Sequence, residues 1–213
     1  MSETGRTPRV ELLGRLLRSA VVAPRGRFRA TADYVTSQGP PSSAVPRRFS
    51  PFRDDGPPRG GQNHDECEIV LHDCDHWHVT TSRGGDYRRT GDDVVVGYPG
   101  HAPLEMDVEN LRAPNADWPY YAGHWAEELV LPHRLLGLLD DLLLDEDDEA
   151  RPRLRGTVSL RQPEAYQGMA GHEVLEVEFT VDLQLAVIVD VTARTWDHRV
   201  DRYTLEVLEL NGA

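Results

Sequence analysis

The feature that most constrains this chain is a repeated alternation of apolar and polar residues in short segments bounded by turn residues. In the segment 26–34, Phe28, Ala30, Ala32 and Tyr34 share one face, and arginine, threonine and aspartate occupy the other. A period of two with one polar face is typical of an antiparallel strand that covers a core on one side. The chain is therefore expected to bury one face of a sheet.

Eight more segments carry the same kind of signal. They lie at residues 66–72, 76–81, 85–90, 94–98, 154–161, 173–181, 185–189 and 203–210. The first four start eight to ten residues apart and are separated by turn residues such as those at 83–85 and 91–93, which is the spacing of a β-meander. The sequence thus predicts about five strands, then a helix, then about four strands.

Two segments have helical spacing instead. At residues 10–22, Val10, Leu13, Leu16 and Leu17 fall on one face of a predicted amphipathic helix. A second helix is predicted at 132–144, because proline suits a first helical turn and the leucines of this segment make a broad apolar stripe. Many strands with few helices predict an α+β fold, with one antiparallel sheet packed by helices on a single face.

Two long stretches lack any pattern. Residues 37–63 are rich in proline, serine and glycine, so we expect a disordered insertion there. Residues 101–126 are predicted to be irregular and hold a group of four large aromatic side chains. With 213 residues, one domain that includes these loops is the expected organisation for 1–213.

Charge limits the classes of partner. Residues 1–60 hold 11 Arg and 5 acids, a balance of +6, whereas residues 61–213 hold 12 Arg and 31 acids, a balance of −19. An acidic body is repelled by phosphate backbones and anionic lipids, so neither nucleic-acid binding nor stable membrane insertion is expected. Without a recognisable export signal, we expect a cytoplasmic location in which Cys67 and Cys74 are reduced thiols.

One cluster of histidine and cysteine suggests a metal site. It contains His72, Cys74, His76 and His78, with Cys67 upstream. The six residues between the two cysteines do not match zinc-site spacing, so polar side chains on the solvent face of a hairpin are the preferred interpretation. Nucleophile-elbow, phosphate-loop and calcium-loop patterns are also missing from the sequence, so no cofactor and no catalytic residue is predicted.

The aromatic residues have two possible roles. Trp77 alternates with histidines on a predicted strand, and Trp118, Tyr120, Tyr121 and Trp125 lie in the irregular stretch. These side chains could fill the open side of a curved sheet as part of the core, or they could form the rim of an apolar pocket.

The order of motifs resembles the superfamily of LolA/LolB-like lipoprotein carriers, in an actinobacterial, non-secreted variety. The segments that carry the resemblance are the helix at 10–22, the strand start at 26–30, the hairpin at 68–79, the strand at 91–98, the leucine-rich segment 132–144, the strand start at 169–177 and the strand at 187–190. The resemblance implies a curved antiparallel sheet, an incomplete β-barrel with helices on its concave face, which accepts acyl chains in the carriers. The family has no catalytic residues to transfer, and this chain shows no lipobox cysteine.

The resulting hypothesis is a non-enzymatic protein that binds an apolar small molecule, a lipid or acyl chain, in the concave half-barrel. Its expected ligand-binding residues are Phe28, Tyr34, Trp77, Trp118, Trp125, Leu175, Val177 and Phe179. One alternative is a protein-interaction or regulatory module whose pocket is filled by its own predicted helix and aromatic loop. A distant alternative is a metal-dependent protein that uses the histidine and cysteine cluster.

Overall fold

The structure of the chain is a computed structural model. It describes residues 10–17, 23–35, 62–97, 99–107, 124–146, 148–159, 169, 174–196 and 198–210. Among these residues, no helix is long and apolar enough to cross a membrane.

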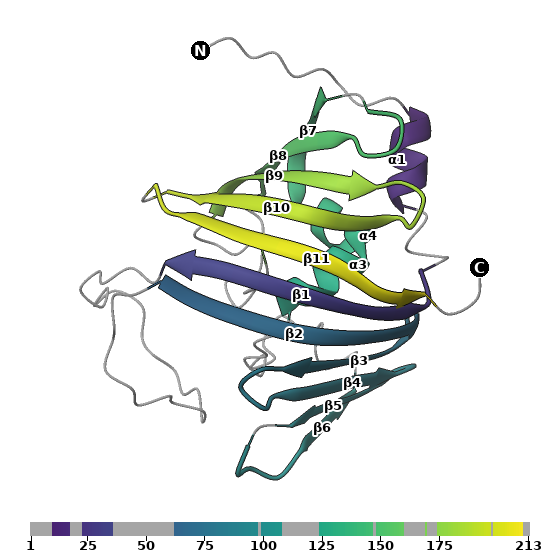
Figure 1. Cartoon of the computed structure of the whole chain (residues 1–213), viewed down its shortest axis with the longest axis vertical. Coiled ribbons are helices and arrows are strands. Elements are labelled where there is room, and N and C mark those ends of the chain that lie inside the picture. Colours follow the sequence, from purple (N-terminus) through teal and green to yellow (C-terminus); the bar gives the residue numbers. More distant parts are fainter. Residues whose placement is uncertain are drawn as a thin grey trace.

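The described strands join one antiparallel sheet of 11 strands (Figure 1). The first six are β1 (Gly26–Val35), β2 (Gln62–Asp73), β3 (His76–Thr81), β4 (Asp86–Thr90), β5 (Asp93–Gly97) and β6 (Leu104–Asp107). The others are β7 (Leu139–Glu146), β8 (Arg153–Val158), β9 (Val174–Asp182), β10 (Val187–Thr195) and β11 (Val200–Leu210). Their spatial order is β6-β5-β4-β3-β2-β1-β11-β10-β9-β8-β7. The two meanders therefore meet where β1 pairs with β11, and the sheet stays open because β6 and β7 are its edges.

One face of the sheet is polar and exposed, as the alternation in β1 predicts. Arg27 and Arg29 point outward from β1, next to acidic side chains on the neighbouring strands. A guanidinium nitrogen of Arg27 lies 2.5 Å from Glu68 on β2, and Arg29 lies 3.0 Å from Glu66 on the same strand. Exposed pairs of this kind add little to stability, because water and salt screen the two charges. Their main effect is to make this face of the sheet polar, so that it faces the solvent.

The other face is buried and carries the core. In β1 its members are Phe28, Ala30 and Ala32, each with no exposed surface. Helices α3 (His124–Val130) and α4 (Pro132–Leu136) lie behind the middle strands in Figure 1, and α3 packs against β10 and β1. The ring of Trp125 on α3 lies 5.6 Å from that of Tyr203 on β11. The predicted incomplete barrel with helices on its concave face is therefore confirmed.

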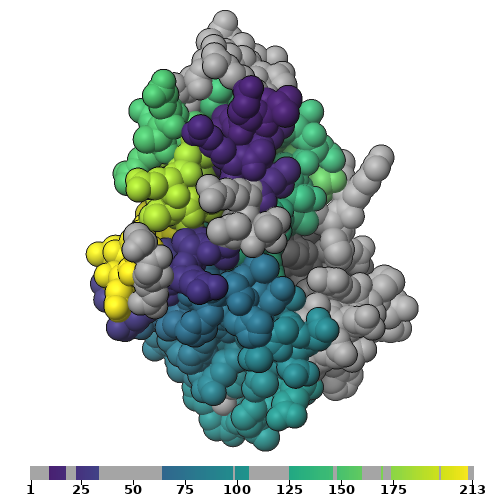
Figure 2. All heavy atoms as spheres, turned by 90° about the vertical axis from the view of Figure 1, so that its right-hand side faces the viewer, coloured from purple at the N-terminus to yellow at the C-terminus, as the bar shows by residue number. Residues whose placement is uncertain are grey.

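Helix α1 (Val10–Leu17) lies at the β7 end of the sheet and contacts α4 (Figure 1). Figure 2 shows it on the surface, next to the green segments of the β7–β10 region. Leu16 is its one fully buried residue, so the amphipathic pattern of this segment does mark a packed face. The helix was predicted to extend to residue 22, but residues 18–22 lie outside the described part of the chain.

The second predicted helix, at 132–144, is wrong over most of its length. Only Pro132–Leu136 is helical, and the N–H of Gly137 closes this short helix by donating to the His133 carbonyl oxygen at 3.1 Å. The leucine run that follows forms β7, with Leu144 opposite Leu154 of β8. Several successive leucines fit a buried helix and a buried strand equally well, and here the neighbouring strand β8 decides in favour of pairing.

Other boundaries also differ from the prediction. The stretch 101–126, predicted to be irregular, contains β6 and the start of α3, while residues 108–123 are not described. The predicted insertion at 37–63 includes Gln62 and Asn63, which pair with Val35 and Tyr34 as the first residues of β2. Residues 37–61 lie outside the described residues. Strand β10 continues to Thr195, well past residue 189, because β9 pairs with it from Val187 to Thr195 and β11 pairs with it from Asp190 to Arg194.

Candidate functional site

The concave face brings together five of the eight residues predicted to bind a ligand. Phe28, Val177 and Phe179 are at most 1% exposed, on strands β1 and β9. Trp77 on β3 and Trp125 on α3 are 3% and 7% exposed. The side chains of Tyr34 and Trp118 lie outside the described residues. The five described residues that point inward form part of one continuous apolar core with helices α3 and α4.

Leu175 is the exception, because its side chain is 51% exposed. Thr195 of β10 pairs with Val174 and Arg194 pairs with Glu176, so Leu175 is an extra residue in β9, a β-bulge. A bulge shifts the alternation of the strand by one residue. Val174 and Val177 therefore both point inward, three residues apart, and Leu175 does not line the concave face as predicted.

Trp77 lies in a partly polar environment. Its ring is 4.8 Å from that of Tyr87, and the guanidinium carbon of Arg134 on α4 lies 5.7 Å from the Trp77 ring centre. Burial raises the pKa of the Tyr87 hydroxyl to about 12, so this group stays neutral at every physiological pH. The indole Nε1 of Trp77 is buried without a hydrogen-bond acceptor among the described residues.

Two buried carboxylates on α3 were not predicted from the sequence. Glu127 and Glu128 are 2% and 1% exposed, in the segment HWAEELV. A charged side chain is almost never fully buried unless it is paired. Glu127 is paired, because its Oε2 atom contacts a guanidinium nitrogen of Arg134, and its Oε1 atom has no partner among the described residues. In the sequence, the two adjacent acids within an apolar segment that contains tryptophan were the signal that could have indicated buried carboxylates here.

The environment of Glu128 is different, because no cation of the described residues forms an ion pair with it. Its Oε2 atom accepts a hydrogen bond from the backbone N–H of Met169 at 2.8 Å. Its Oε1 atom is buried without a partner within the described part of the chain. Desolvation raises the pKa of the Glu128 carboxyl to about 8, although the Met169 hydrogen bond acts in the opposite direction. Glu128 is therefore mainly protonated at neutral pH.

We refer to Glu127, Glu128 and Arg134 together as the acidic cluster: Glu127 contacts Arg134, and Glu128 follows Glu127 on α3. When both carboxyls are ionised the cluster has a charge of −1, and when Glu128 is protonated it is neutral. The unpartnered oxygens of the two glutamates are hydrogen-bonding positions that the described part of the protein leaves unused. A buried polar atom without a partner costs about 1–3 kcal/mol, so a ligand that supplies a partner gains binding energy there.

The histidine and cysteine cluster is engaged in surface contacts. His76 Nδ1 lies 2.8 Å from an Asp73 carboxylate oxygen, and His78 Nε2 lies 2.8 Å from one of Asp86. No group of three histidine, cysteine, aspartate or glutamate side chains in the described residues is arranged to hold a metal ion. Cys67 points into the core, and burial raises the pKa of its thiol to about 12. These contacts match solvent-face side chains of a hairpin.

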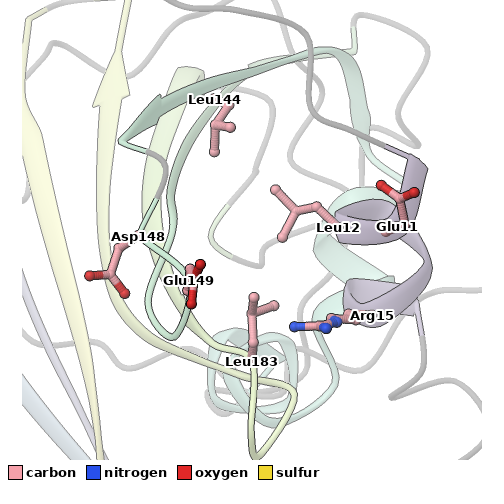
Figure 3. Close-up of a pocket in the computed structure, with 7 residues that line it drawn as sticks. All are labelled: Glu11, Leu12, Arg15, Leu144, Asp148, Glu149 and Leu183. Atoms are coloured by element: carbon pink, nitrogen blue, oxygen red, sulfur yellow. The ribbon is translucent and has the colours of Figure 1, made fainter.

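A separate pocket of about 360 Å³ lies between α1, the β7–β8 loop and the β9–β10 turn (Figure 3). Its lining residues are Glu11, Leu12, Arg15, Leu144, Asp148, Glu149 and Leu183. The Asp148 carboxylate already accepts hydrogen bonds from the backbone N–H groups of Ala150 and Arg151, at 2.8 and 2.6 Å. None of the eight predicted residues lines this pocket, although Leu144 belongs to the apolar core and Leu12 and Leu183 pack against that core.

No protein-family model matches the sequence, and no curated protein matches it either. Several solved structures resemble the fold. The LolA superfamily protein NE2245 from Nitrosomonas europaea aligns over 94% of this chain and 94% of its own, at 11% identity and a TM-score of 0.34. An uncharacterised conserved protein from Thermus thermophilus aligns over 95% and 86%, at 10% identity and a TM-score of 0.46.

A third structure, the complex of MucA and MucB from Pseudomonas aeruginosa, aligns over 95% of this chain and 58% of that chain. Its identity is 10% and its TM-score is 0.42. A LolA superfamily protein is thus among the matches, as the sequence resemblance predicted. The actinobacterial affinity stays a prediction.

Proposed function

We propose that this chain is a non-enzymatic binding protein that holds an apolar ligand, a lipid or an acyl chain, between the concave face of its sheet and helices α3 and α4. The main observation in support of the proposal is that the helices that cover the concave face are short. Helix α3 has 7 residues and α4 has 5. Isolated helices shorter than about 12–15 residues are marginal in water, so both depend on the contacts that they make with the sheet.

A cover of this kind is suited to exchange with a ligand. Displacing α3 would uncover apolar side chains of β1 and β10, the strands that it packs against, among them Phe28, which is otherwise fully buried. Each methylene group of a ligand buried there would contribute about 0.8 kcal/mol. An acyl chain of ordinary length could therefore replace the contacts of one short helix.

A second candidate function, that of a protein-interaction or regulatory module, is favoured by the complete burial of the leucines on helices α3 and α4. Leu129, Leu131 and Leu135 from α3, α4 and their junction have no exposed surface, as expected where helices fill a pocket permanently. The chain would then act as a protein-interaction or regulatory module through its surface. The filling segment differs from the one first expected, because residues 139–143 belong to β7.

Native mass spectrometry of the protein purified without detergent separates the two functions. A ligand carrier is expected to retain a lipid mass, or to take up an added acyl chain after delipidation, whereas a permanently filled half-barrel stays bare under both conditions. A bare protein that also fails to take up acyl chains of several lengths would refute the carrier function.

Two substitutions on β9 make a matched pair for this experiment. Val177→Phe adds volume on the concave face, and Leu175→Phe adds a bulkier side chain at an exposed position two residues away. We expect the first to weaken acyl-chain binding at least several-fold and the second to leave it unchanged, with circular dichroism to confirm that both variants fold. Equal effects would place the ligand elsewhere. The cytoplasmic location stays a prediction.

A further inference from the structure

We propose that the ligand of the half-barrel carries a cationic amine head group, which the acidic cluster of Glu127, Glu128 and Arg134 binds inside the concave face. This inference rests on the proposed function and adds the chemical class of the ligand. It starts from groups that an apolar site does not require, namely two carboxyls at 2% and 1% exposure on a helix that covers an apolar face.

When both carboxyls are ionised, the charges of the acidic cluster are not balanced within the described chain. Arg134 lies against Glu127 and faces the ring of Trp77, so its charge is already matched by one carboxylate. Glu128 receives only the backbone N–H of Met169. One more positive charge would bring the cluster with both acids ionised to neutrality. An alkylammonium group has that charge, and its alkyl chain suits the apolar wall.

The hydrogen-bonding atoms of the cluster support the same class of ligand. Oε1 of Glu127 and Oε1 of Glu128 are both buried without a donor among the described residues. When ionised, a carboxylate is purely an acceptor, and an ammonium group supplies three donors and no acceptor. A carboxylate head would bring only further acceptors and a second negative charge. A hydroxyl head would satisfy one oxygen and leave the charge unbalanced.

Amine binding is expected to release a proton. In the free protein Glu128 is held mainly in its neutral form by burial, with a pKa of about 8. An ammonium ion beside the carboxyl favours ionisation of Glu128, as any opposite charge in a dry site does. At pH 7 the complex should therefore form with loss of close to one proton per ligand, and the affinity should increase as the pH rises toward 8.

Isothermal titration calorimetry with three probes of equal chain length tests the proposal on the full chain. The probes are dodecylamine, dodecanol and dodecanoic acid, each below its solubility limit and, for the amine and the acid, below the micelle concentration, in two buffers with different ionisation enthalpies at pH 7. We expect dodecylamine to bind about 10- to 100-fold more tightly than dodecanol, the factor expected for one charge-assisted hydrogen bond. Dodecanoic acid should bind most weakly, and the amine alone should release a proton.

Two isosteric variants complete the test. Glu128→Gln keeps the acceptor for the Met169 N–H but cannot ionise, so it should lose the advantage of the amine and the proton release while it still binds dodecanol. Glu105→Gln removes the same charge from an exposed position on β6 and should change neither the preference for the amine nor the proton release.

If no probe binds, the proposed function itself fails. If the alcohol or the acid binds as tightly as the amine, or if both variants reduce amine binding equally, the half-barrel site stands and the amine assignment is overturned.

Discussion

At the scale of single residues, burial determines what the ionisable groups of this protein can do. Cys67 and Glu128 are enclosed by apolar neighbours, which raises the pKa of each group because water no longer stabilises the charged form. For Asp73 and Asp86 on the exposed face, loss of hydration is the largest single effect and raises the pKa, but hydrogen bonds and charges from His76, His78 and Arg88 together outweigh it, so both pKa values are lowered. Loss of hydration thus raises the pKa on both faces, and the hydrogen bonds and charges on the exposed face reverse the net shift.

The stability of the protein should depend on Glu128 in a defined pH range. The pKa of this carboxyl is about 8 in the folded protein, against an ordinary value of 4.5 that applies to the unfolded chain, so folding favours the protonated form. Stability contributed by the protonated group is complete below pH 4.5 and is lost as the pH rises through 8. The free energy of unfolding of Glu128→Gln relative to the unmodified protein should therefore increase across this range, by an amount on the order of 4 kcal/mol.

Urea unfolding at intervals between about pH 4 and 9, the range that spans both pKa values, measures this difference. Subtracting the two curves cancels the titration of the surface acids and histidines, which both proteins share. The other members of the acidic cluster, Glu127 and Arg134, are also common to both proteins. A difference that stays constant with pH would show that Glu128 is ionised or exposed in the folded protein.

The two cysteines should differ in reactivity. Cys67 is 1% exposed and has a thiol pKa of about 12, whereas Cys74 is partly exposed in the β2–β3 turn. Since the thiolate is the reactive form, iodoacetamide at about pH 8 should label Cys74 first and reach Cys67 only after unfolding. Peptide mapping by mass spectrometry follows both sites, and rapid labelling of Cys67 in the folded protein would contradict the buried position of its side chain on β2.

At the scale of elements, close approach between strands places strict limits on some positions. A Cβ atom added at Gly26, at the start of β1, would lie 2.2 Å from the carbonyl oxygen of Glu209 on β11. This is the seam that joins the two meanders, and the register of the pair shifts between Arg27 and Phe28. Only glycine fits there without movement of the backbone.

Gly26→Ala is therefore expected to destabilise the protein by about 1–3 kcal/mol, the usual cost of forcing extra volume into a packed site. Gly97→Ala on β5 is the matched control, because its added Cβ would lie 3.5 Å from its nearest neighbour, an ordinary contact distance. Thermal unfolding of both variants gives the comparison. A Gly26→Ala variant as stable as the control would mean that β1 and β11 are farther apart than this distance implies.

The elements also show how far the sequence can predict the fold. Strands such as β1 and β3 could be predicted because one face is solvent-exposed and the other is buried, which gives an alternation of polar and apolar residues in the sequence. Strand β7 could not, since its successive leucines carry no period that distinguishes a strand from a helix. The outward position of Leu175 depends on a bulge in β9, and the burial of Glu128 depends on where α3 packs. Both are set by tertiary contacts that local sequence does not encode.

At the scale of the whole molecule, the protein is an open sheet whose single dry face is covered by short helices. Its outer face is exposed to water and carries cross-strand ion pairs. Its inner face is one apolar surface that continues from β5 through the paired strands β1 and β11 to β8. The only fully buried charged residues in the described chain come from helix α3. A ligand that enters this face would therefore meet apolar strands on one side and the acidic cluster on the other.

Tryptophan fluorescence can locate a ligand on this face directly. Among the described residues, Trp77 lies on the concave face at 3% exposure, and Trp196 lies in the β10–β11 turn at 63% exposure. Two single-tryptophan proteins are needed, each with the other three tryptophans replaced by phenylalanine, and a dodecyl-chain ligand brominated along its chain serves as a contact quencher. We expect saturable quenching of Trp77 and none of Trp196. Quenching of Trp196 alone, or of neither, would contradict binding inside the half-barrel.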